Sequence, residues 1–217
     1  MIEVIKKVKF AALALFVVAG LLFMSNTVYA GSTLTSDDGL WNFTEAGEIG
    51  NYLGSESVVT IPEQLTSNGV TYNITKIPWN ALSWNQNITQ INIGKNITSI
   101  ANAPFVDMTS LKDIKVSSEN ADYCDINGIL YNKAKTKLMR FPQMNSTEVL
   151  ELPDTYVESN INALEKCSNV YKLIIPASYT GKASNVGEAL SYKSFPNLGA
   201  CEEKSVKSAF YDKIKLS

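Results

Sequence analysis

The stretch Ile88-Thr89-Gln90-Ile91-Asn92-Ile93 decides the fold, because its pattern returns in Leu111-Lys112-Asp113-Ile114-Lys115-Val116. The offset between the two stretches is 111 − 88 = 23. The segment before them repeats at the same offset, from Ile74-Thr75-Lys76-Ile77 to Ile97-Thr98-Ser99-Ile100. A constant period in the low twenties, with apolar residues at the same phase, is typical of a solenoid of stacked short units. The sequence therefore predicts a mainly β solenoid whose units follow this period.

A third copy follows the first at an offset of 156 − 74 = 82. One unit cannot fold alone, because its apolar side chains contribute on the order of 10–15 kcal/mol. Ordering the residues of one unit costs about 35 kcal/mol. We therefore expect the copies to be neighbours in space, with Ile91, Ile114 and Leu173 in one column and with capped ends. The corresponding residues of the third copy are Tyr156, Leu164, Val170, Leu173 and Ile175, and extra strand-like pieces lie at Val59-Thr60-Ile61 and Val149-Leu150-Glu151.

The segment 1–30 has the pattern of a secretory signal peptide. Three lysines, Lys6, Lys7 and Lys9, precede an uncharged apolar run over positions 10–24, and small residues stand before the end of the segment at Ala30. A retained membrane anchor would need about 20 apolar residues, and this run has only 24 − 10 + 1 = 15. We therefore expect cleavage after Ala30, secretion or display at the cell surface, and no membrane insertion afterwards.

The mature chain is expected to be one domain over 31–217. The turns Asp38-Gly39 and Asn68-Gly69 accept the positive φ of tight hairpins and predict a hairpin cap. The spacing of Val206, Ala209, Phe210 and Ile214 predicts a short C-terminal helix. The expected parts are an N-terminal cap at 31–73, repeats at 74–116, an inserted meander at 117–147, a repeat at 148–176 and a C-terminal cap at 177–217.

The insertion is predicted as a β-hairpin meander, because apolar strands flank the turn Asn127-Gly128. Asp122, Asp125 and Asn127 also raise a calcium loop as an alternative. Its spacing does not fit, since the glycine should take the sixth position and a glutamate should follow at the twelfth. No metal site and no cofactor are expected.

Two segments resemble the BspA-like leucine-rich repeat, one over 92–111 and the other over 163–176. The segment 125–133 also resembles the hairpin that recurs between repeats in that family. The resemblance extends over 40–176. It implies a leucine-rich-repeat solenoid in a secreted or surface-displayed bacterial protein, used for adhesion or for contact with host or neighbouring cells. Such proteins bind a protein or glycan and do not catalyse, so the chain is not expected to be an enzyme.

Composition excludes several other functions. The chain has no histidine, so serine and cysteine nucleophiles lack their base and most zinc sites lack their ligands. Without the signal peptide it has 19 − 3 = 16 basic and 21 − 1 = 20 acidic side chains, with Arg140 as the only arginine, so no nucleic-acid partner is expected. Two alternatives stay open: a carbohydrate-active hydrolase with a carboxylate pair from Glu119, Asp122 and Asp125, and a structural spacer that binds nothing.

The chain has three cysteines, so at most one disulfide can form. Cys167 takes the place of Met108 in the second copy and is expected to be buried as a small apolar residue. A bond between Cys124 and Cys201 stays open as an alternative.

The candidate binding residues follow from strand alternation and from exposed aromatic side chains. Outward positions on neighbouring strands would form a polar ladder with a spacing of about 4.8 Å. Tryptophans beside such a stack either shield the end of the core or contact a sugar ring or a protein partner. The candidates are Gln90, Asn92, Asp113, Lys115, Glu151, Lys172, Trp79 and Trp84.

Overall fold

A computed structural model gives the fold of residues 33–160, 163–179 and 200–203, the last range as backbone only. Within these ranges it has seventeen strands and no helix, and residues from Leu34 onward belong to one compact unit. The strands are β1 (Thr33–Thr35), β2 (Trp41–Thr44), β3 (Ile49–Tyr52), β4 (Val58–Thr60), β5 (Gln64–Ser67), β6 (Val70–Asn73), β7 (Lys76–Ile77), β8 (Gln90–Ile93), β9 (Ser99–Ile100), β10 (Asp113–Val116), β11 (Tyr123–Ile126), β12 (Ile129–Asn132), β13 (Lys137–Arg140), β14 (Val149–Glu151), β15 (Glu158–Ser159), β16 (Lys172–Ile175) and β17 (Ala200–Glu203).

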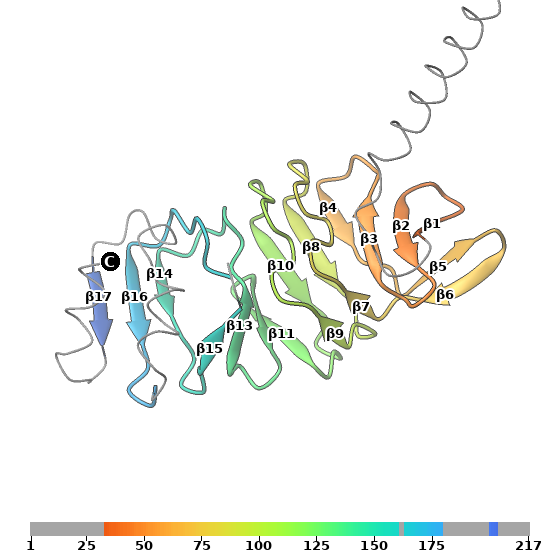
Figure 1. Cartoon of the computed structure of the whole chain (residues 1–217). Helices are drawn as coiled ribbons and strands as arrows, with labels where there is room; N and C mark the ends of the chain where they lie inside the picture. Colours follow the sequence, from red (N-terminus) through yellow and green to blue (C-terminus); the bar gives the residue numbers. More distant parts are fainter. Residues whose placement is uncertain (1–32, 161–162, 180–199, 204–217) are drawn as a thin grey trace, which may run out of the picture. The chain divides into compact units, whose positions relative to one another are not determined.

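The repeated strands form a parallel sheet, as the repeat period predicts. β8 lies between β4 and β10 (Figure 1). Val59 is in register with Ile91, and Ile91 with Ile114. These three side chains are 3%, 0% and 0% exposed, respectively, whereas the residues on either side of each are exposed or half-buried. Successive strand residues point to opposite faces, so the column predicted for the first two copies is confirmed, and Val59 extends it.

A second set of short parallel strands lies on the other side of each unit. β7 pairs with β9, which places Ile77 beside Ile100. The backbone N–H of Ala101 donates to the carbonyl of Ile77 over 2.9 Å, again across about one period. Ile77 and Ile100 belong to the same buried cluster as Ile91. Each unit therefore contributes one strand to each side of a shared core.

The turn between the two sides has the same unusual backbone in successive units. Positive φ angles occur at alternate residues, and they return one period later with different side chains. The angles are 63°, 58° and 60° at Asn80, Leu82 and Trp84, then 53°, 57° and 53° at Ala103, Phe105 and Asp107, and 60° at Lys166 in the third copy. The left-handed conformation is uncommon outside glycine. Its repetition indicates that stacking, rather than any one side chain, imposes it.

The insertion is a meander, as predicted. β11 pairs antiparallel with β12 across the turn Asn127-Gly128, and β12 pairs antiparallel with β13. β13 then lies parallel to β15 of the third copy. At its start, the Tyr123 hydroxyl accepts a hydrogen bond from the backbone N–H of Ile100 over 2.8 Å. The meander is therefore joined to the second copy at one end and to the third at the other.

This insertion divides the repeat strands into two sheets, which corrects one prediction. β14, β16 and β17 form a parallel sheet separate from that of β4, β8 and β10. Leu173 pairs with Leu150, and it belongs to a different buried cluster from Ile91 and Ile114. Leu173 therefore does not continue their column directly. The physical reason is that meander side chains fill the intervening space, with Leu130 in the first cluster and Tyr131 in the second.

The N-terminal part contains the predicted hairpins. β2 pairs with β3, and β5 pairs with β6 across Asn68-Gly69. Asn68 and Gly69 have φ angles of 51° and 76°, the left-handed conformation that this turn requires. The Asp37 carboxylate accepts hydrogen bonds from their backbone N–H groups over 2.8 and 3.3 Å. This contact fixes the hairpin tip against the first segment of the domain.

At the C-terminal end, the backbone of β17 pairs in parallel with β16. The helix expected over 206–214 lies outside the described residues, as does the signal peptide expected over 1–30. Within the described ranges, no helix is long and apolar enough to cross a membrane.

Candidate binding surface on the repeat sheet

The outward side chains of β4, β8 and β10 form two rows across the sheet. The first row consists of Val58, Gln90 and Asp113, and the second of Thr60, Asn92 and Lys115. All six are exposed or half-buried, and neighbouring strands are about 4.8 Å apart. The four residues that the sequence predicts on these strands therefore lie side by side.

Hydrogen bonds orient the polar groups of these rows. Asn92 is central, because its Oδ1 accepts from Gln90 Nε2 over 2.8 Å and its Nδ2 donates to Thr60 Oγ1 over 3.0 Å. Lys115 Nζ lies 3.6 Å from Asp113 Oδ1, and these side chains are 48% and 40% exposed. Groups already held in place lose less conformational entropy on binding than free ones. The rows are thus a pre-organised polar surface.

The meander borders this surface on the β10 side. A Cβ atom on Gly128 would meet the carboxylate of Asp113 and would lie 3.1 Å from the side-chain nitrogen of Asn145. Gly128 has a φ of 79°. The Asn145 Nδ2 donates to the carbonyls of Lys112 and Asn127 over 2.9 Å each. Asp113 is therefore packed against the meander turn on one side and open to solvent on the other.

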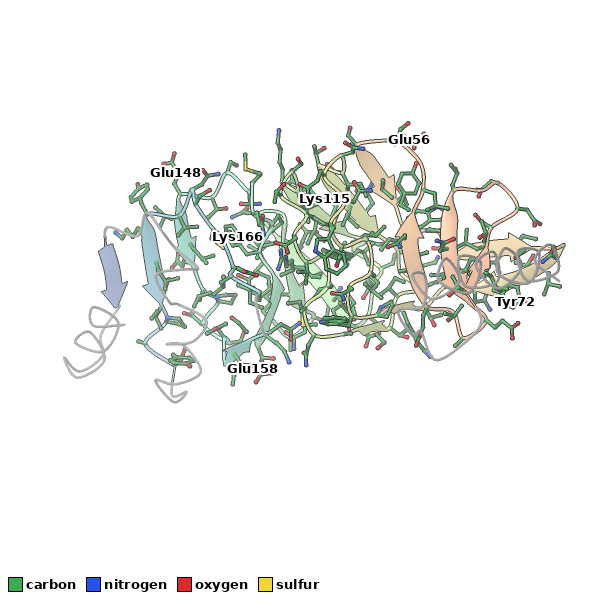
Figure 2. The ribbon with its side chains drawn as sticks, turned by 45° about the horizontal axis from the view of Figure 1, so that its top comes forward. Glu56, Tyr72, Lys115, Glu148, Glu158 and Lys166 are labelled. Atoms are coloured by element: carbon green, nitrogen blue, oxygen red, sulfur yellow. The ribbon has the colours of Figure 1, made fainter. Side chains whose placement is uncertain are left out.

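Glu151 and Lys172 lie on the second parallel sheet, in β14 and β16. They are in adjacent rows, since Lys172 is in register with Val149, and Glu151 with Ile174. The arrows of both sheets run in the same direction along one side of the stack in Figure 1. Figure 2 shows Lys115 and Glu148 towards the same upper side of the ribbon, whereas Glu158 of β15 lies at its lower edge. Glu151 and Lys172 therefore belong to a second group of outward residues, on β14 and β16.

Trp79 and Trp84 lie apart from both sheets. They belong to the turn between β7 and β8, and they are 62% and 60% exposed. The candidates predicted from the sequence thus occupy three places: the rows of β8 and β10, the strands β14 and β16, and this turn.

Sequence reasoning missed an ion pair that connects two copies across the meander. Lys166 Nζ lies 2.8 Å from Asp107 Oδ1. Hydrogen bonding and charge from Lys166 lower the pKa of Asp107, and the same contact raises the pKa of Lys166. Both residues stand at the turn position of Trp84 in their own copies (84 + 23 = 107; 84 + 82 = 166). The pair could have been predicted from the repeat offsets, because they place an acidic and a basic residue at equivalent turn positions.

The carboxylates considered for hydrolysis have separate local partners. Glu119 pairs with Lys95 over 3.1 Å, and Asp125 Oδ1 accepts a hydrogen bond from the backbone N–H of Val116 over 2.8 Å. The Asp122 charge contributes to raising the pKa of Tyr123, for which burial is the larger cause. In the part of the chain that the structure describes, there is no group of three or more histidine, cysteine, aspartate or glutamate side chains that could hold a metal ion.

Cys167 is buried, as the sequence predicts. Its side chain is fully buried, and the thiol donates to the carbonyl of Leu164 over 3.0 Å. Cys124 carries a free thiol that is half-buried. Burial is the main cause that raises the pKa of both thiols.

Stacked parallel strands with a constant inward column and variable outward rows define a repeat solenoid. The family model described as BspA type leucine rich repeat region matches residues 59–126 in six copies. Residues 59–126, from β4 to the end of β11, therefore contain BspA-type leucine-rich repeats.

Solved structures of bacterial repeat proteins are similar to the chain. A leucine-rich repeat protein from Eubacterium ventriosum has 23% identity and a TM-score of 0.46, over 57% of this chain and 31% of its own. The pneumococcal vaccine antigen PcpA has 13% identity and a TM-score of 0.42, over 82% and 71%. A leucine-rich repeat protein from Bacteroides capillosus has 18% identity and a TM-score of 0.39, over 80% and 99%. The chain thus spans about a third of the Eubacterium protein. No curated protein matches it.

Proposed function

We propose that this chain is a secreted or surface-displayed bacterial protein that binds a protein or glycan partner noncovalently. The binding surface is the set of outward rows on β4, β8 and β10, with the outward residues of β14 and β16 as its second part. The chain acts as a binding module and not as an enzyme.

The observation that carries this proposal is the contrast between the two faces of the repeat strands. The inward column of Val59, Ile91 and Ile114 is apolar in every strand and buried. The outward positions differ between copies, since Gln90 is replaced by Asp113 in register. A stack that needs only its inward face leaves the outward face open to specialisation for a ligand.

Export is supported by the signal-peptide pattern over 1–30 and by the resemblance to surface-displayed family members. The leucine-rich repeat region at 59–126 supports recognition, because solenoids offer long surfaces on which several neighbouring strands contact one partner.

The two alternatives make different demands. A retaining or inverting hydrolase needs two carboxyl groups about 5–10 Å apart around one sugar ring. Glu119 and Asp125 are each occupied by a separate group, an ammonium and a backbone N–H. A spacer would need no specific outward residues, and changes on the rows would then have no effect on any partner.

The test is a binding screen of the segment 31–217 against purified host matrix proteins and a glycan array. The surface variant carries Asp113→Ala and Lys115→Ala. A matched control carries Lys95→Ala and Glu119→Ala, which removes an exposed ion pair of the same charges elsewhere. We expect a hit that the surface variant weakens about tenfold or more and the control leaves unchanged.

Two results would count against the proposal. A hit that survives the surface variant and also Glu151→Ala with Lys172→Ala would exclude these rows as the site. The absence of any hit in the screen would favour the spacer.

A further inference from the structure

The turn between β7 and β8 exposes two tryptophans. Trp79 and Trp84 have 62% and 60% of their surfaces exposed, more than any other large apolar residue that the structure describes. Only four positions of the turn, 80–83, separate them. Exposed indole surface is costly in water, so it calls for an explanation.

The neighbouring copies show that the stack does not need tryptophan at these positions. One period after Trp79 and Trp84, the chain has Asn102 and Asp107, and the third copy has Lys166 at the second position. Trp84, Asp107 and Lys166 all have positive φ angles, of 60°, 53° and 60°. The same backbone therefore forms with an indole, a carboxylate or an ammonium group.

The middle of the same turn behaves in the opposite way. Leu82, Phe105 and Leu164 stand at equivalent positions, and all three are apolar and no more than 1% exposed. The fold thus requires an apolar residue at the middle of the turn in each copy. It makes no such requirement at the positions of the two tryptophans. The packing of the core therefore does not account for the two exposed indoles.

The surroundings of Trp84 are polar. Gln86 Nε2 donates to the carbonyls of Trp84 and Asp107 over 3.2 and 2.8 Å. The Gln86 Oε1 accepts from the Thr109 hydroxyl. The Asp107 carboxylate pairs with Lys166, and the hydrogen bond from Lys166 is the main cause that lowers the pKa of Asp107. Polar groups therefore surround the Trp84 backbone, while most of the side-chain surface stays open to solvent.

We propose that Trp79 and Trp84 form a platform that binds the pyranose rings of an oligosaccharide. A pyranose ring has a face of C–H groups, which packs on an aromatic face, and a rim of hydroxyls, which hydrogen-bond to planar polar groups. Gln86 and Asp107 supply such groups near Trp84, and Lys166 adds an ammonium donor. Sugar hydroxyls can both donate to the Asp107 carboxylate and accept from the Lys166 ammonium, so these neighbours match the hydroxyl rim of a sugar ring.

This site goes beyond the proposed binding by the sheet, and it shares no residue with the outward rows. The two proposals can therefore fail separately. Loss of sugar binding in the tryptophan variants, with normal binding in the Asp113→Ala, Lys115→Ala variant, assigns the sugar to the turn.

The experiment uses the intrinsic fluorescence of the segment 31–217 with cellohexaose, chitohexaose and maltohexaose as probes. The chain has three tryptophans, and the third, Trp41, is 5% exposed. Emission changes and protection from iodide quenching therefore report on the two turn indoles. We expect a saturable change with at least one probe.

The variants copy residues that the other units already carry. Trp79→Asn and Trp84→Lys should each weaken binding about tenfold while leaving the thermal unfolding midpoint unchanged within a few degrees. Trp84→Phe retains an aromatic face and should bind within about threefold of the original chain, whereas Trp84→Leu should bind about tenfold more weakly.

Two outcomes would overturn the assignment. One is the absence of any saturable change with the three probes up to about 1 mM. The other is equal sugar binding by Trp84→Leu and Trp84→Phe, which would show that an apolar contact of any shape suffices.

Discussion

The side chain of Asn120 joins the second copy to the meander, and its removal gives a sharp test of this junction. Asn120 is 1% exposed. Its Nδ2 donates to the carbonyls of Gly94 and Ile97 over 2.8 and 3.0 Å. Its Oδ1 accepts from the backbone N–H groups of Asp122 and Tyr123 over 2.9 and 2.8 Å. One amide therefore satisfies four backbone groups.

Asn120→Ala removes four hydrogen bonds, each of which contributes about 0.5–1.5 kcal/mol net to stability. The expected loss in the free energy of unfolding therefore lies between about 2 and 6 kcal/mol. Water will reach some of the freed groups, and we expect a loss of about 3 kcal/mol in the free energy of unfolding. Urea unfolding followed by circular dichroism measures it. The control is Asn102→Ala, at an exposed position, which should change stability by less than about 0.5 kcal/mol.

Asn120→Asp separates the donor role from the acceptor role. The carboxylate can still accept from Asp122 and Tyr123, but it faces the carbonyl oxygens of Gly94 and Ile97 without a proton. Burial and these oxygens should raise its folded pKa above the unfolded value of about 3.9. The loss relative to the original chain is then smallest below that unfolded pKa and grows as pH rises through the folded pKa.

The reasoning would be refuted by a loss of less than about 1 kcal/mol in Asn120→Ala. It would also be refuted if the difference between Asn120→Asp and the original chain were the same at about pH 4 and about pH 7.5.

Three further predictions concern single contacts. The buried thiol of Cys167, whose pKa burial raises, should resist iodoacetamide at about pH 8 in the native chain while Cys124 reacts; equal labelling by mass spectrometry would contradict its burial. Gly128→Ala should lower the free energy of urea unfolding by about 1–3 kcal/mol, because Gly128 has a positive φ and a Cβ there would meet the Asp113 carboxylate. Adding Asp113→Ala to this variant should restore part of the lost stability. Asp107→Asn should cost less than about 1 kcal/mol, and thermal unfolding in high salt should abolish the difference, because the ion pair is exposed.

The repeat core could be predicted because two independent signals agree. The repeat period and the alternation around Ile91 and Ile114 both require a parallel stack with these residues inside. The turn Asn68-Gly69 predicted the N-terminal hairpin for a local reason, since few other residue pairs accept its backbone. Where local chemistry and the repeat agree, the fold follows from the sequence.

The division of the core could not be predicted in the same way. The meander breaks the period, so no offset shows whether Leu130 and Tyr131 lie beside the stack or between its copies. Arg140 gives a second example, because arginine is rarely buried, yet its side chain is 1% exposed. Burial lowers its pKa, and nearby groups, including Cys167, oppose that shift.

The candidate surface was predicted for β8 and β10 by alternation alone, because outward residues follow once the inward column is known. Val58 and Thr60 were missed, although they complete both rows. The offset from β4 to β8 is 91 − 59 = 32 and not one period, since the hairpin of β5 and β6 lies between them. An irregular offset hides register from a search for a fixed period.

The most direct test of the stacked core is a double-mutant cycle on Ile91 and Ile114, measured by urea unfolding of Ile91→Ala, Ile114→Ala and the double variant. The two side chains are in register on adjacent strands and fully buried. The stack predicts a coupling energy of about 1 kcal/mol between them. It also predicts additivity within about 0.5 kcal/mol for Ile91 with Leu173, which lies in the other cluster. Additive losses at Ile91 and Ile114 would contradict the stacking of these units.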